Sequence, residues 1–268
     1  MPISATGSAA HHGRAAASLV CEVAGGLSAA THILRDSLRG TAPAASRELH
    51  VGLRPEPVIL VHGLCANSSC FSSMERHLHR EGYTVFAVNY SCFGADIAAC
   101  GRHLEREAAW LRDQTGSESA NVVAHSLGGL VLRWAMAHTW MRDWVEVAVT
   151  LGSPHRGTPT ARLAPAGLPG FGKLIGELRT TTGPGDPDPL DPLDGRATRR
   201  ATRWVAVAAQ HDWVVPASYA RLPQSPNVRN VTVPWGGHLT LPNSRDCWQL
   251  IVEELAAAER RKQDAAAA

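Results

Sequence analysis

Six short segments that we interpret as strands alternate with segments of helical periodicity, and this alternation constrains the fold more than any other feature of the chain. The six segments are 57–61, 83–88, 121–124, 145–151, 203–209 and 228–233. The first of them, at 57–61, is continuously apolar, which is typical of a strand buried on both faces of a parallel sheet. Helical spacing is found at 69–81, 97–115, 127–139 and 246–262. Alternating strands and helices imply βαβ units, so we predict an α/β fold with a mainly parallel central sheet of six or more strands flanked by helices.

Composition excludes several classes of protein. The 268 residues are 44% hydrophobic and 19% charged, which is ordinary for a soluble globular enzyme. No uncharged apolar run is long enough to cross a bilayer, so we expect no transmembrane segment. Lys and Arg number 26 against 24 Asp and Glu, and a nucleic-acid-binding protein normally carries a basic stripe, so we expect no nucleic-acid partner. The sequence makes no prediction of the oligomeric state.

The chain divides into three parts. We expect an N-terminal extension at 1–56 with one amphipathic helix, a main domain at 57–262 and a disordered tail at 263–268. The helix of the extension, at about 16–39, either packs on the domain, as we expect, or anchors at a membrane. Within the main domain, residues 156–200 are rich in proline and glycine and interrupt the alternation. A loop of this length predicts a functional lid or cap, with a disordered surface loop as the alternative.

The strongest chemical signal is the segment 124–129, Ala-His-Ser-Leu-Gly-Gly. It lies where a predicted strand ends and a predicted helix begins, which is the context that a nucleophile elbow requires. The turn is tight, so the positions two before and two after the serine must be small, and Ala124 and Gly128 occupy them. We predict Ser126 as a nucleophile; a serine that only caps the helix is the alternative.

A serine hydroxyl needs a base, and that base needs an orienting acid. After an elbow of this kind the chain order is serine, acid, histidine. Asp212 follows the strand at 203–209, and His238 follows the strand at 228–233 and two glycines, so we predict them as acid and base. The competing acids, which no predicted strand precedes, are Asp186, Asp188, Asp191 and Asp194. The histidines that fit the base less well are His62, His125, His155 and His211.

Acyl transfer also needs two hydrogen-bond donors for the developing oxyanion. The residue after the nucleophile supplies one, so we predict the backbone N–H of Leu127. The second comes from a loop after an earlier strand, and the loop at 62–64 follows the first strand. We predict the N–H of Leu64, with Gly63 allowing a close approach of the backbone.

With these motifs in place, the chain resembles a bacterial lipase/esterase of the α/β-hydrolase superfamily over roughly 57–258. The resemblance is carried by Val-His-Gly-Leu at 61–64, Ala-His-Ser-Leu-Gly-Gly at 124–129, Thr-Leu-Gly-Ser-Pro-His-Arg-Gly-Thr at 150–158, Asp212 with Val215-Pro216, and Gly237-His238. It implies hydrolysis of carboxylic esters by a triad of Ser126, Asp212 and His238, often beneath a lid over an apolar acyl pocket. Some relatives bind Ca²⁺ or Zn²⁺, but the sequence offers no convincing cluster, so we expect no metal and no cofactor.

The expected partner is a small-molecule ester or lipid substrate. Alternatives that keep the same triad are an acyltransferase or a thioesterase, and a non-catalytic interaction protein is a third. Trp213 and Trp235 adjoin the proposed acid and base, where they either wall the substrate pocket or fill the core. In the insert, an apolar face at near-helical spacing is available to cover an acyl chain; its residues are Phe171, Leu174, Ile175 and Leu178.

The six cysteines do not form a metal-binding pattern, because no C-x-x-C occurs. Glu22 interrupts the apolar run after Arg14, which leaves a weak signal peptide. We therefore expect a cytoplasmic protein with reduced thiols, secretion being the weaker alternative, in which case Cys65 and Cys70 could pair.

Overall fold

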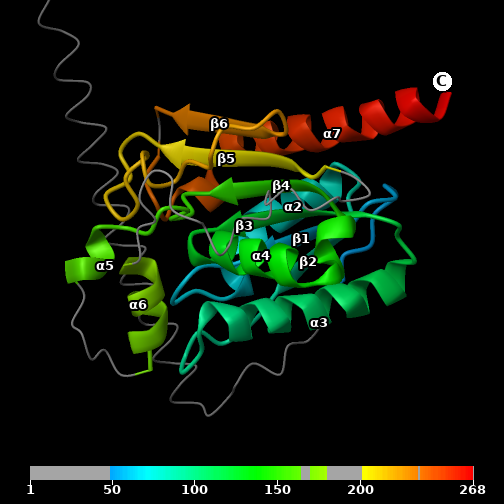
Figure 1. Ribbon diagram of the computed structural model, residues 1–268. Helices are drawn as coiled ribbons and strands as arrows, with labels where there is room; N and C mark the ends of the chain where they lie inside the picture. Colours follow the sequence, from blue (N-terminus) through cyan, green and yellow to red (C-terminus); the bar gives the residue numbers. More distant parts are fainter. Residues whose placement is uncertain (1–48, 164–169, 180–200, 235, 268) are drawn as a thin grey trace, which may run out of the picture.

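The computed structural model describes residues 49–163, 170–179, 201–234 and 236–267. Its centre is a parallel sheet of six strands in the order β2-β1-β3-β4-β5-β6 (Figure 1). The strands are β1 (Val58–Val61), β2 (Val85–Val88), β3 (Ala120–His125), β4 (Val145–Leu151), β5 (Arg203–Ala209) and β6 (Val228–Val233). The predicted fold class is confirmed, and β4, β5 and β6 begin and end at the predicted residues.

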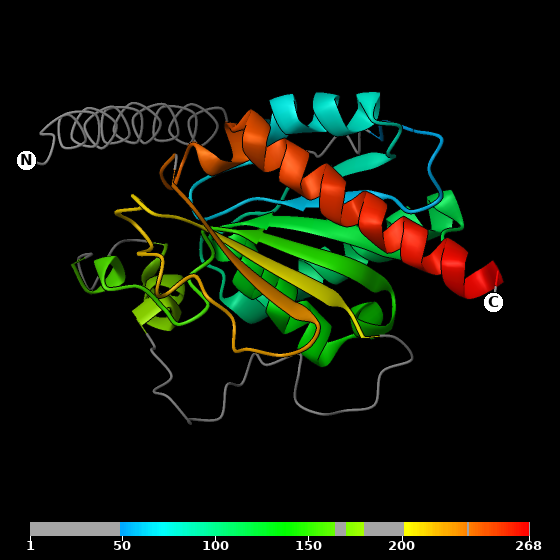
Figure 2. The ribbon, with the colours of Figure 1, turned by 90° about the horizontal axis from the view of Figure 1, so that it is seen from above.

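Helices cover both faces of this sheet. The longer ones are α2 (Ser72–Arg80), α3 (Ile97–Thr115), α4 (Leu127–His138) and α7 (Arg245–Ala267). The described residues also contain short elements: η1 (Ser68–Phe71), η2 (Trp140–Asp143), α5 (Thr160–Leu163), α6 (Gly172–Arg179) and η3 (Leu241–Asn243). Figure 2 shows α2 and α7 on one side of the sheet and α3 and α4 on the other.

Strand residues alternate between these two sides, as the pleat of a strand requires. In β1, Val58 and Leu60 join the core cluster that holds α2 and α7, whereas Ile59 and Val61 join the cluster that holds α3 and α4. All four side chains are fully buried. The strand therefore has no polar position, which is why it appears in the sequence as a continuous apolar run.

The ends of α3 follow their sequence signals. Asp96 accepts a hydrogen bond from the N–H of Ala99 at 2.7 Å and caps the first turn. Gly116 closes the helix at φ 61°, where its N–H donates to the carbonyl of Arg112. Buried side chains of α3 pack in the same core cluster as those of α4, the helix that begins at the elbow.

Two predictions of organisation need correction. The helix α7 continues to Ala267, so the expected tail at 263–268 is wrong for residues 263–267. The reason is the alanine-rich end of the chain, because alanine has the highest helix propensity. In the insert, the near-helical spacing of Leu174, Ile175 and Leu178 falls in α6, and α5 is a helix that the sequence did not predict. The predicted helix at 16–39 lies outside the described residues.

Parallel pairing brings the carboxyl ends of all six strands to one edge of the sheet. The arrowheads in Figure 1 point to the same side, and α5 and α6 lie along that side. Loops at this edge follow β1, β3, β4, β5 and β6, and open α/β sheets place their ligand sites at such an edge.

Candidate active site

Ser126, Asp212 and His238 lie 26 to 112 positions apart in the sequence and meet at this edge. Ser126 directly follows β3, Asp212 comes three residues after β5, and His238 comes five residues after β6. Because β3, β4, β5 and β6 are neighbours in the sheet, the three loops lie side by side.

The three side chains form one hydrogen-bonded chain. Nδ1 of His238 lies 2.8 Å from Oδ2 of Asp212, and Nε2 of His238 lies 2.9 Å from Oγ of Ser126. A carboxylate only accepts, so Nδ1 carries the hydrogen and Nε2 is left as the acceptor for the serine O–H. The imidazole is thus oriented to remove a proton from the hydroxyl.

The carboxylate of Asp212 is held from its other side by the backbone. Its Oδ1 accepts the N–H of Val214 at 2.9 Å and the N–H of Val215 at 2.7 Å. The Asp212 side chain is fully buried, and that of His238 is 5% exposed. Both oxygens of the carboxylate are therefore satisfied, and one of them is committed to the histidine.

Ser126 has the backbone strain expected of an elbow. Its φ is 55° and its ψ is −125°, and it is one of two described non-glycine residues with positive φ. Such strain concentrates at functional sites, because only a tightly packed surrounding holds it. A Cβ on Gly128 would lie 2.4 Å from the carbonyl oxygen of Val61, and one on Gly129 would lie 2.2 Å from Oγ of Ser153. These contacts explain why glycines must follow the serine.

The loop after β1 lies against the nucleophile. A Cβ on Gly63 would be 2.8 Å from Cβ of Ser126, so Gly63 permits the close approach that the sequence predicted. Leu64 follows it and is partly buried against the core, and Leu127 is fully buried at the first position of α4. The amides of a helix's first turn have no acceptor within the helix, so the N–H of Leu127 is available to a substrate oxygen.

His62 and Tyr90 hold this loop in place. The N–H of Tyr90 donates to Nε2 of His62 at 3.3 Å, and Nδ1 of His62 donates to the carbonyl of Gly63 at 2.9 Å. The Tyr90 hydroxyl donates to the carbonyl of His62 at 2.5 Å, and the two rings stack with centroids 4.2 Å apart. Burial lowers the pKa of His62 to about 4, so His62 stays neutral and structural.

The remaining predicted residues are placed as follows. Trp213 is 60% exposed, so it does not fill the core, and a role in binding substrate stays a prediction. Trp235 and the four competing aspartates lie outside the described residues. Cys65 and Cys70 are free thiols.

Two residues that matter to this geometry were missed by sequence reasoning. Gly152, directly after β4, has φ 56°, and a Cβ there would lie 3.1 Å from Oδ2 of Asp212 and 3.2 Å from Nδ1 of His238. Its signal was a glycine at the end of a buried strand, which often marks a close backbone approach. Tyr90 has no motif of its own, and only the pairing of β1 with β2 brings it to His62.

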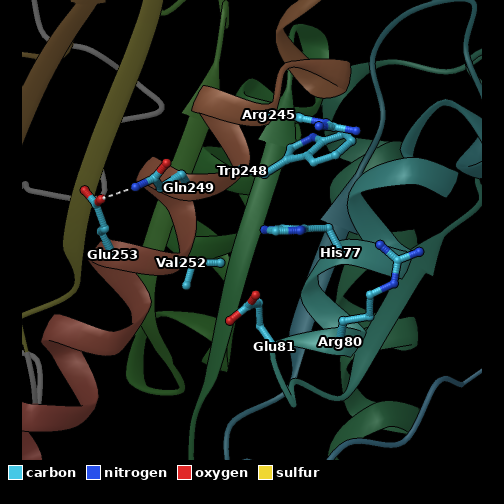
Figure 3. A pocket seen from close by; sticks show the side chains of 8 residues that line it. All are labelled: His77, Arg80, Glu81, Arg245, Trp248, Gln249, Val252 and Glu253. Carbon is cyan, nitrogen blue, oxygen red and sulfur yellow. Dashed lines mark hydrogen bonds between the residues drawn. The ribbon is translucent and has the colours of Figure 1, made fainter.

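Elsewhere, a groove of about 560 Å³ lies between α2 and α7 (Figure 3). It is lined by charges of both signs, and the His77 and Trp248 rings lie 5.3 Å apart in it. None of the three triad candidates lines it. Across the described ranges, no three His, Cys, Asp or Glu side chains gather as a metal-binding group. No helix in the same ranges is both long enough and apolar enough to cross a membrane.

Comparison with known proteins gives a consistent result. The family model described as the alpha/beta hydrolase fold matches residues 56–184. A triacylglycerol lipase of Pseudarthrobacter phenanthrenivorans is 34% identical over 115 residues, and methylesterase 3 of Arabidopsis thaliana is 32% identical over 108 residues. These matches cover 39% and 38% of this chain, and the chain spans only 35% and 41% of the length of the two relatives.

Solved structures share the fold over most of the chain. The mature lipase BlEst2 of Bacillus licheniformis superimposes with a TM-score of 0.62 at 20% identity, covering 77% of this chain and 94% of that one. An esterase of Thermogutta terrifontis gives a TM-score of 0.60 at 17% identity, covering 81% and 96%. The sheet order, the strained serine after β3 and these similarities together show that the chain has the α/β-hydrolase fold, and the relatives and solved structures named here are lipases and esterases.

Proposed function

We propose that this protein hydrolyses carboxylic esters through a covalent acyl-enzyme formed on Ser126. The observation that carries the proposal is the chain of hydrogen bonds from Asp212 through His238 to the oxygen of Ser126, at 2.8 and 2.9 Å. A hydroxyl within hydrogen-bond distance of an imidazole nitrogen can lose its proton to that nitrogen as it attacks a carbonyl carbon.

The reaction takes two steps. Ser126 attacks the ester carbonyl while His238 takes its proton, and His238 then donates that proton to the leaving alcohol. The backbone N–H groups of Leu64 and Leu127 stabilise the oxyanion of the tetrahedral intermediate. Water, activated by the same histidine, releases the acid. Asp212 holds the imidazole in the right tautomer throughout and stabilises its charged form.

The proposed substrates are esters with an apolar acyl or alcohol group. Large apolar side chains are exposed on segments that follow the carboxyl ends of three strands: Phe93 after β2, Leu163 after β4, and Trp213 with Val214 after β5. Their exposed fractions are 68%, 85%, 60% and 37%. Exposed apolar side chains on segments that leave the same edge of the sheet as Ser126 favour apolar ligands there. The triacylglycerol lipases among the relatives support the same substrate class.

The test is a series of p-nitrophenyl esters from acetate to palmitate. We expect the wild-type protein to hydrolyse them, and the Ser126→Ala variant to lose on the order of 10⁶ in turnover with an unchanged melting temperature. Asp212→Asn should lose about 10⁴. Ser218→Ala, which truncates an exposed serine, is the control and should match the wild type. A folded Ser126→Ala variant that keeps a tenth of the turnover would refute the assignment.

A further inference from the structure

His125 makes one contact that the reaction described above does not use. It is the last residue of β3, directly before the nucleophile, and it is buried at 5% exposure. Its Nε2 lies 2.9 Å from the backbone carbonyl oxygen of His238, and the two rings lie 5.0 Å apart at 44°. A carbonyl oxygen only accepts, so Nε2 of His125 carries a hydrogen and donates it.

His125 is built as a permanent donor rather than as a second base. Burial, and then the nearby His238, lower its pKa to about 3, so the ring stays neutral wherever the reaction runs. Because the hydrogen on Nε2 is engaged by the carbonyl, this nitrogen cannot accept the proton of Ser126.

The segment that carries His238 is a loop between β6 and η3, and two of its described backbone bonds stay within it. The N–H of Gly237 donates to Oγ1 of Thr240 at 2.7 Å, and the N–H of Leu241 donates to the carbonyl of Gly237 at 3.2 Å. Gly236, at φ 74°, adds backbone freedom. The bond from His125 is a direct link between this segment and the strand that presents the nucleophile.

We propose that His125 is a positioning residue for the general base. Its Nε2–H fixes the backbone of His238 relative to Ser126 and thereby keeps Nε2 of His238 within hydrogen-bond distance of the serine oxygen. This inference rests on the proposed ester hydrolysis, and it explains why a histidine, rather than another residue of similar size, precedes the nucleophile. A displacement of about 1 Å in such a contact can cost about 100-fold in rate.

The experiment compares two substitutions at one site. His125→Phe keeps a ring but removes the donor, whereas His125→Gln places an amide N–H close to the position of Nε2. His138→Phe is the matched control, because the His138 ring also bonds a carbonyl, that of Trp134 at 2.8 Å, but on the exposed surface of α4. Each variant is assayed with p-nitrophenyl butyrate for kcat and KM, by thermal melting, and for the rate at which a dialkyl p-nitrophenyl phosphate phosphorylates Ser126.

We expect His125→Phe to lose between 10- and 100-fold in kcat and in phosphorylation rate, with KM changed less than about threefold. His125→Gln should recover at least half of that loss on a logarithmic scale, and His138→Phe should match the wild type. A general loss of structure would lower the melting temperature of both His125 variants without rescue by glutamine. Equal losses in both variants, or wild-type kcat in His125→Phe, would overturn the proposal.

A measurement on the unmodified protein keeps the proposal testable if both variants fail to fold. Nitrogen-15 NMR of the histidine rings should show His125 neutral with its hydrogen on Nε2 from pH 5 to 8. A hydrogen on Nδ1 would overturn the proposal. If the proposed ester hydrolysis is itself wrong, the wild-type protein will neither hydrolyse the ester nor react with the phosphate. This outcome is distinct from a failure of the His125 proposal, in which the wild-type protein is active.

Discussion

At the scale of single residues, the site depends on backbone atoms coming unusually close to side chains. Gly152 and Gly116 are a natural pair for testing this, because both adopt a left-handed conformation, with φ near 56° and 61°. A side chain at Gly152 would press on the Asp212–His238 pair, whereas nothing lies within 4 Å of a Cβ at Gly116. The two positions therefore share the conformational cost of a substitution and differ in what the added Cβ would contact.

We predict that Gly152→Ala lowers kcat for a short p-nitrophenyl ester by at least 10-fold, while Gly116→Ala leaves kcat unchanged. Both variants should lose about 1–2 kcal/mol of unfolding free energy, the cost of a left-handed alanine. Steady-state kinetics and urea unfolding measure the two effects separately. A Gly152→Ala variant as active as Gly116→Ala would show that the Asp212–His238 pair tolerates the added methyl group.

At the scale of elements, the described part of the insert is fastened to the domain at several points. Glu177 of α6 accepts the N–H of Ile97 at the start of α3 at 2.9 Å, and the hydroxyls of Thr158 and Thr160 donate to the carbonyl of Val214 at 2.6 and 2.7 Å. Most of the apolar face that was predicted to cover an acyl chain is buried inside the protein. Three of its four residues, Leu174, Ile175 and Leu178, are 0 to 7% exposed.

We predict that Leu174→Ala destabilises the protein by about 2–5 kcal/mol, the range for truncating a fully buried leucine. Leu163→Ala, at a leucine of α5 that is 85% exposed, should change stability by less than about 0.5 kcal/mol. Urea unfolding of both variants measures the two changes in unfolding free energy. A Leu174→Ala variant as stable as the wild type would mean that α6 is a loosely attached lid in solution.

At the scale of the whole molecule, buried neutral histidines make stability depend on pH. Burial lowers the pKa of His62 to about 4 and that of His125 to about 3, and it holds the pKa of His155 well below its usual value. In the unfolded chain these groups titrate near 6.5. As the pH falls below 6.5, the unfolded state therefore binds protons that the folded state does not, and the free energy of unfolding decreases.

We predict a loss on the order of 2 kcal/mol per buried histidine between pH 7.5 and pH 5. Urea unfolding at several pH values measures it. His125→Gln should reduce the slope of stability against pH, and His138→Gln, at an exposed position of α4, should leave it unchanged. Stability that is constant over this range would indicate that water reaches these rings and lets them charge.

The sequence by itself determined where the six strands and the longer helices lie, and which types of residue meet in the site. Residues such as Val58 to Val61 are apolar at every position because both faces of a parallel strand are buried, so the strands could be located without a structure. Ser126, Asp212 and His238 could be located because each follows a predicted strand, and strand ends meet at one edge.

Only the tertiary structure decided which backbone atoms touch which side chains across that edge. Gly152 beside the Asp212–His238 pair, Tyr90 on His62, and His125 on the carbonyl of His238 are contacts between segments far apart in the chain. The largest separation among them, between His125 and His238, is 113 residues. No local pattern encodes such contacts, because they arise from strand order and register, which depend on how the whole sheet packs.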